Sequence, residues 1–171
     1  SLQRVSRIRR LRHILGGVIL FPFYWGIAYF TPVPGLAFRR LCALLGVRLL
    51  ISGHDLRRTY NLIVSPMDSV RYFEFDFMWR AMGEMKIHSY LDVSSPRLFP
   101  LMVVDRTPDL VADLINPDKK DLPMTISWAK SFDIADRCRF HACRIEGAPL
   151  EPNSFDVITS ISVIEHIPDD K

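Results

Sequence analysis

Two aspartates stand where a nucleotide-binding sheet places its acids. Asp92 lies in the apolar run 90–93, and Asp113 closes the run 110–113. They are 21 residues apart, close to the spacing of about 20 at which a βαβ unit sets an acid against a ribose hydroxyl. The pattern predicts recognition of a nucleoside through hydrogen bonds from its ribose to a carboxylate.

The residues around these aspartates predict a strand, a tight turn, a short helix and a second strand over 89–118. Apolar runs that end in turn residues are typical of buried parallel strands. Ser94, Ser95 and Pro96 supply the turn. Ser95 is suited to capping the helix, and Pro96 to its first position, where no N–H is needed. The chain then predicts one further helix and two further strands, at 123–132, 139–143 and 155–159.

The second half of the chain, about residues 66–171, resembles a class I S-adenosylmethionine-dependent methyltransferase, in particular methyltransferase type 11. The resemblance rests on the strand and acids above and on two later sequences, APLEPNSFDVI at 148–158 and SVIEHIP at 162–168. These are similar to that family's LPFPDNSFDVV…VLEHI stretch. The expected fold class is α/β: a partial Rossmann-like, mostly parallel sheet with flanking helices. The resemblance implies an enzyme that uses S-adenosyl-L-methionine to methylate a small-molecule or lipid acceptor.

The resemblance also implies cofactor contacts at Asp92, Ser94, Ser95, Asp113, Leu114, Glu146, Ser160 and Ile161. The first three would lie beside the methionine portion of the cofactor. Asp113 would accept hydrogen bonds from the ribose hydroxyls, and Leu114 would pack on the adenine. Ser160 and Ile161 would line the reactive side.

Two positions depart from the family pattern. Arg144 stands where the family has an acid after the third strand, so Glu146 is the substitute candidate for the adenine amino group. The family's Gly-x-Gly turn is Ser94-Ser95-Pro96 here, and no glycine occurs between Gly83 and Gly147. Glycine matters most where backbone approaches a pyrophosphate, which S-adenosylmethionine lacks. The change therefore argues more strongly against NAD(P) than against a methyltransferase.

No catalytic constellation is recognisable in the sequence: there is no Gly-x-Ser-x-Gly elbow, no Walker lysine loop and no His-Glu-x-x-His. Methyl transfer from a sulfonium is an in-line displacement that depends on alignment and needs no protein nucleophile, so the catalytic residues stay unassigned. Three cysteines without framework spacing indicate reduced thiols in a cytoplasmic setting. No metal is expected at the Cys138–Cys143 cluster, because no second ligand pair follows.

The beginning of the chain is basic and apolar. Residues 1–54 carry eight arginines and no acid, and residues 14–38 carry no charge. One interpretation is a signal peptide, which would need a cleavage site of small residues. Another is a membrane-spanning helix, which would need about 20 apolar residues in a row, whereas Pro22 interrupts the apolar run. A third interpretation is surface association of residues 14–50 with a membrane, with Arg39, Arg40 and Arg48 near anionic headgroups. A fourth is that these helices pack on the domain. Nucleic acid is not expected, since the arginines adjoin lipid-like sequence.

The predicted domains are 1–53, an apolar, arginine-rich helical segment, and 54–171, the N-terminal part of a methyltransferase-like α/β domain. A helix is predicted from Ser65 to Gly83, where Val70, Phe73, Phe77 and Ala81 recur at helical spacing. Its aromatic residues are expected in the core: Tyr72, Phe73, Phe75, Phe77 and Trp79. Four strands are expected where the family usually has seven, so the sequence is interpreted as truncated. The alternative function is a non-catalytic, membrane-associated Rossmann-like remnant or interaction module.

Overall fold

The computed structural model describes residues 12, 15–20, 22, 23, 25–27, 35–83 and 85–163. The chain divides into two compact units, which we call the N-terminal unit (Ser1–Met82) and the sheet unit (Gly83–Lys171). The helix predicted after Ser65 therefore belongs to the N-terminal unit. The predicted start of the methyltransferase-like domain at residue 54 stays a prediction. Some residues of the sequence argument lie outside the described residues: Glu165 and His166 of the second motif, Pro32, Pro34 and the arginines before residue 12.

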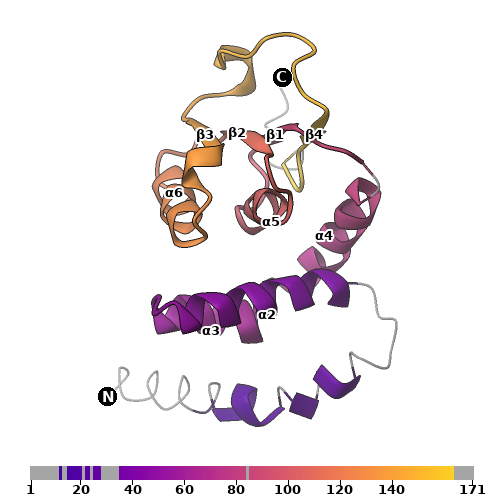
Figure 1. Ribbon diagram of the computed structural model, residues 1–171, viewed down its shortest axis with the longest axis vertical. Helices are drawn as coiled ribbons and strands as arrows, with labels where there is room; N and C mark the ends of the chain where they lie inside the picture. The colour runs from indigo at the N-terminus through magenta and orange to yellow at the C-terminus, as the bar shows by residue number, and fades with distance from the viewer. Residues whose placement is uncertain are drawn as a thin grey trace, which may run out of the picture. The chain divides into compact units, whose positions relative to one another are not determined.

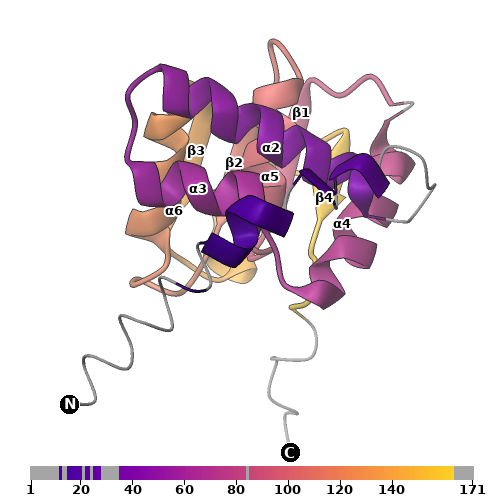
Figure 2. The ribbon, with the colours of Figure 1, turned by 90° about the horizontal axis from the view of Figure 1, so that it is seen from below.

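Three helices make up most of the described N-terminal unit: α2 (Leu36–Ile51), α3 (Leu56–Val64) and α4 (Ser69–Met82). Asp55 caps α3 by accepting a hydrogen bond from the Arg57 N–H at 3.3 Å. Helices α2 and α3 lie side by side (Figures 1 and 2). Gly46 permits this approach, because a Cβ there would lie 2.7 Å from Ile63 Cγ1 and 3.1 Å from the Thr59 carbonyl oxygen.

The prediction for α4 was wrong in its orientation and its start. Phe73 and Phe77 are 62% and 71% exposed, and Val70 is exposed as well, whereas Phe75 is buried. Spacing shows which residues share a helix face, but it does not show which face packs. The ring of Phe38 decides this, since it meets the rings of Phe75 and Trp79 edge-on with centroids 5.3 and 5.4 Å away.

The start of α4 also differs from the prediction, which placed a cap at Ser65. That residue ends α3, and its N–H donates to the Asn61 carbonyl at 2.9 Å. Residues 15–20, 22, 23 and 25–27 are helical. None of the helices in the described ranges combines the length and apolar character that crossing a bilayer requires.

The sheet unit alternates strands and helices. Its elements are β1 (Ser89–Val93), α5 (Leu98–Arg106), β2 (Val111–Ile115), α6 (Leu122–Ser131), η1 (Ala135–Arg137), β3 (Cys138–His141), η2 (Ile145–Gly147) and β4 (Val157–Thr159). All strand pairs are parallel, and the order is β3-β2-β1-β4. Figure 1 shows α5 and α6 on one face of this sheet and the β3–β4 connection on the other. The α/β, Rossmann-like fold class is confirmed.

The register brings the carboxyl ends of the strands to one edge of the sheet. Asp92 is paired with Leu114 on one side and Thr159 on the other. Because the strands are parallel, the segments that follow β1, β2 and β4 all leave from this edge, where α/β sheets bind their ligands. The predicted turn residues Ser94 and Ser95 are therefore placed at this edge.

Candidate functional site

A buried carboxylate joins the ends of β1 and β4. Asp92 Oδ1 accepts a hydrogen bond from Thr159 Oγ1 at 2.7 Å, and Oδ2 accepts one from the Ser95 N–H at 3.1 Å. The Tyr90 hydroxyl lies 2.5 Å from Thr159 Oγ1 and 3.4 Å from Asp92 Oδ1. All four residues are buried. Both oxygens of Asp92 are thus engaged by the protein, and the network fixes the turn after β1 relative to β4.

The surroundings of Asp92 change its acidity. Burial raises the pKa of its carboxyl from 3.8 to about 6, against the opposing effect of the hydrogen bonds from Ser95 and Thr159. Burial, with the nearby Asp92 charge, also raises the pKa of Tyr90 well above its ordinary value. The protonation of Asp92 therefore changes just below neutral pH.

Two more hydrogen bonds connect the turn after β1 to the segment after β4. Ser95 Oγ accepts from the Ile161 N–H at 2.9 Å, and Ser160 Oγ donates to the Val93 carbonyl at 3.2 Å. Ile161 and Ser95 are buried, whereas Ser160 is exposed. Four of the predicted site residues, Asp92 included, are thus brought together at the carboxyl edge.

Ser94 adopts a backbone conformation that favours glycine. Its φ is +58°, in the left-handed region that L-residues enter at a cost of roughly 1–2 kcal/mol. Its N–H donates to the Ile115 carbonyl at 2.9 Å, and its Oγ lies 3.3 Å from the same oxygen. The turn therefore follows a glycine-type path although its residue is serine.

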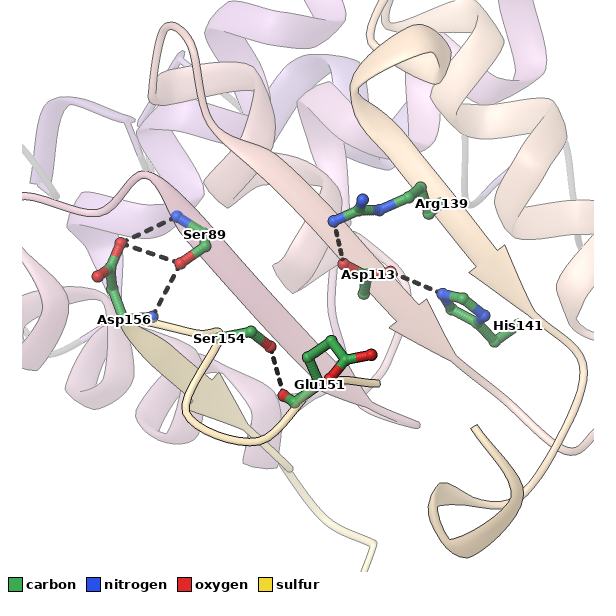
Figure 3. A network of polar contacts seen from close by, with 7 residues as sticks. All are labelled: Ser89, Asp113, Arg139, His141, Glu151, Ser154 and Asp156. Carbon is green, nitrogen blue, oxygen red and sulfur yellow. Dashed lines mark hydrogen bonds and ion pairs between the residues drawn. The ribbon is translucent and has the colours of Figure 1, made fainter. Parts of the chain in front are cut away.

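Asp113 lies in the middle of β2, away from the carboxyl edge. It is paired in register with Leu91 and Arg139. Its Oδ2 accepts from Arg139 Nη2 at 2.7 Å, and its Oδ1 lies 2.7 Å from His141 Nε2 (Figure 3). Asp113 is buried, and both of its oxygens have partners on β3. Its role toward a ribose stays a prediction.

Leu114 is paired with Asp92 in the β1–β2 register, whereas Glu146 lies in the β3–β4 connection. Leu114 is buried in β2 and, as the neighbour of Asp113 in a strand, points to the opposite face of the sheet. Glu146 lies in η2, within the β3–β4 connection, and is exposed. Their predicted contacts with adenine stay predictions.

The polar group that directly follows β2 is Asn116, which is not among the predicted site residues. Its Nδ2 donates to Asp121 Oδ2 at 3.0 Å, and its Oδ1 accepts from the Asp118 N–H at 2.9 Å. Arg97, just before α5, forms an ion pair with Asp121. The sequence signal that would have identified this position is an Asn-Pro pair three residues after Asp113, where the predicted strand ended.

Asp156, in the motif NSFD, has a structural role at the opposite edge of the sheet. Its Oδ2 accepts from the N–H groups of His88 and Ser89 at 2.8 and 3.0 Å, and from Ser89 Oγ at 3.1 Å. Its own N–H donates to Ser89 Oγ at 3.0 Å (Figure 3). These backbone hydrogen bonds lower the pKa of Asp156. The residue fastens the start of β4 to the start of β1.

Comparison with known proteins gives one match. Residues 105–171 match a family model described as Methyltransferase domain, of type 11. No curated protein and no solved structure matches the chain. The matched residues begin in α5 and include β2, β3 and β4 with the segments that follow them.

Proposed function

Because the methyltransferase-domain match and the four-stranded parallel sheet fit a class I S-adenosylmethionine-dependent methyltransferase, we propose that the sheet unit transfers a methyl group from S-adenosyl-L-methionine to a small-molecule or lipid acceptor. The match over residues 105–171 carries this proposal. Members of the family generally bind S-adenosylmethionine, and the match supports methyl transfer in general.

The turn after β1 fits such a cofactor. The family's turn contains glycine, which readily adopts a left-handed backbone. Ser94 adopts the same left-handed conformation, with φ +58°, so the turn can follow the same path without glycine. When bound, the cofactor supplies an activated methyl group on a sulfonium, so the protein has to supply alignment and exclusion of water. The residues of this edge that would hold it are Ser94, Ser160 and Asn116.

The buried network acts behind these residues. Asp92 has both oxygens engaged by Thr159 and Ser95, and Ser95 in turn accepts from the Ile161 N–H. We therefore assign Asp92 as a positioning residue: it sets the distance between the turn after β1 and the segment after β4. A misplacement of about 1 Å in such a frame is enough to reduce the rate about 100-fold.

The test is calorimetric titration of S-adenosylhomocysteine into the full chain. Micromolar binding supports the proposal, and its absence in a protein with a cooperative thermal transition contradicts it. Two variants locate the ribose: Asp113→Asn abolishes binding if the predicted acid holds it, and Asn116→Ala does so if the residue at the end of β2 holds it. Met124→Glu, on the exposed side of α6, is the control that leaves binding unchanged.

One observation favours a second candidate function, a non-catalytic Rossmann-like remnant or interaction module. Both oxygens of the Asp92 carboxylate and both of the Asp113 carboxylate are engaged by protein partners. A sheet that has lost its cofactor would retain such internal contacts because they stabilise the fold. Failure of the folded full chain to bind S-adenosylhomocysteine favours this candidate.

A further inference from the structure

We propose that the N-terminal unit docks on an anionic lipid surface through the exposed apolar side chains of the described residues within 15–27 and of α2. This proposal concerns where the protein acts and does not depend on the chemistry of the sheet unit.

The helical residues within 15–27 have their large side chains turned outward. Every described residue larger than glycine in this range is exposed, with Ile19 at 71%. The glycines at 16, 17 and 26 are only partly exposed. A Cβ on Gly17 would lie 2.6 Å from the Tyr60 hydroxyl of α3, so the segment packs on the unit at Gly17. A helix in water shows the reverse arrangement, with large apolar residues inside.

The outer side of α2 continues this composition. Leu44, Val47 and Ile51 are exposed, Ile51 at 82%, and they recur at the spacing of one helix face. Arg48 is exposed and Arg40 partly exposed on the same helix. Apolar side chains with arginines at their margin form the pattern of a helix that lies in the headgroup region, with arginine stems extended toward the phosphates.

The charge of the unit matches an anionic surface. Residues 1–54 contain eight arginines and no acid, and Arg12 is exposed. Each basic residue near an anionic membrane contributes about 1 kcal/mol, so several suffice for binding together with the apolar side chains. A neutral apolar partner would give these arginines no counter-charge.

The same charges disfavour other occupants of this face. A second copy seated on it would bring two arginine-rich, acid-free segments together, which repel. Nucleic acid would neutralise the arginines, but it would leave the side chains of Ile19 and Ile51 exposed to water. Only a lipid surface satisfies both the apolar side chains and the arginines. The finding that no described helix is suited to cross a bilayer agrees with binding at the surface.

The experiment is flotation of the full chain with vesicles of phosphatidylcholine alone and of phosphatidylcholine mixed with phosphatidylglycerol. We expect partitioning onto the mixed vesicles that weakens as salt is added. The double variant Ile19→Glu, Phe23→Glu should partition at least about tenfold more weakly, because it removes two inserted side chains. Arg12→Gln and Arg48→Gln should each lower binding to mixed vesicles about fivefold. The matched control is Met124→Glu, an exposed helical methionine in the sheet unit.

A spectroscopic arm keeps the test independent of folding defects. Trp25 lies within the proposed face and is 39% exposed, so its fluorescence should shift to shorter wavelength when vesicles are added. Trp25→Phe should lose most of this shift and still partition, since phenylalanine retains the apolar contact.

Three results overturn the proposal: equal binding to both vesicle types, no binding, or partitioning that Ile19→Glu, Phe23→Glu leaves unchanged. Self-association without lipid that the double variant abolishes assigns the face to a second copy. Retention of duplex DNA that survives the double variant assigns the arginines to nucleic acid.

Discussion

The two units of this chain differ in how many of their large apolar side chains are exposed to solvent. Among the described residues, fifteen of the twenty exposed large hydrophobic side chains lie in the N-terminal unit and five in the sheet unit. By sequence the N-terminal unit carries a net charge of +8 and the sheet unit one of −5. The sheet unit buries its apolar residues and holds a polar network at its edge, whereas the N-terminal unit displays apolar and basic groups together. This difference is consistent with the two proposals, a site at the edge of the sheet unit and a docking surface on the N-terminal unit.

The largest expected effect separates a buried phenylalanine from an exposed one. Phe99→Ala in α5 removes a fully buried ring from the sheet unit and should lower the free energy of unfolding by about 3–5 kcal/mol. Phe77→Ala in α4 should change it by less than about 0.5 kcal/mol, because the ring is exposed. Urea unfolding followed by circular dichroism measures both. Equal losses would remove the contrast between the two units.

The second expected effect is a pH dependence that arises from Asp92. Its pKa is 3.8 in the unfolded chain and about 6 in the fold, so the folded protein retains a proton that the unfolded chain releases. This contribution is fully present below the unfolded value and is lost as pH rises through the folded value, amounting to about 3 kcal/mol. Unfolding free energies of the wild type should therefore fall, relative to those of Asp92→Asn, between about pH 4 and pH 7. A difference between the two proteins that stays constant with pH would mean that the carboxyl is ionised throughout.

The third expected effect examines the internal packing of the N-terminal unit. Gly46→Ala should destabilise the protein by about 1–3 kcal/mol, because the new methyl meets α3 backbone and side chains that have little room to move. Gly16→Ala is the matched control: that glycine is also helical, with nothing within 4 Å of a Cβ. There the change should stabilise by up to about 1 kcal/mol through helix propensity. Thermal unfolding distinguishes the two, and a neutral Gly46→Ala would show that α2 and α3 are loosely packed.

The features that sequence reasoning obtained correctly are local ones. The runs around Asp92 and Asp113 predicted two parallel strands because apolar runs and the turn signals that end them act over a few positions. The orientation of α4 was missed because it depends on Phe38, which lies 37 residues before Phe75. The partners of Asp113 come from β3, and one partner of Asp92, Thr159, comes from β4. The sequence alone does not show whether a carboxylate is free to bind a ligand. The residues that hydrogen-bond to it are brought close only when the sheet folds.

The contact between Asp156 and Ser89 has a consequence for the order of folding. It spans 67 residues, whereas the β2–β3 contact of Asp113 with Arg139 spans 26. Closing the longer loop costs roughly 1 kcal/mol more chain entropy, so we expect β1, β2 and β3 to associate first and β4 to dock last. The bonds of Asp92 and Ser95 to the β4 side span 67 and 66 residues, and they form only at that step.

During synthesis the strands β1 to β3 would therefore leave the ribosome before β4, and the contacts of Asp92 and Ser95 with the β4 side would form last. Pulse-labelled hydrogen exchange should show the Leu114 amide protected before that of Ile158. Simultaneous protection would mean that the sheet closes in one step.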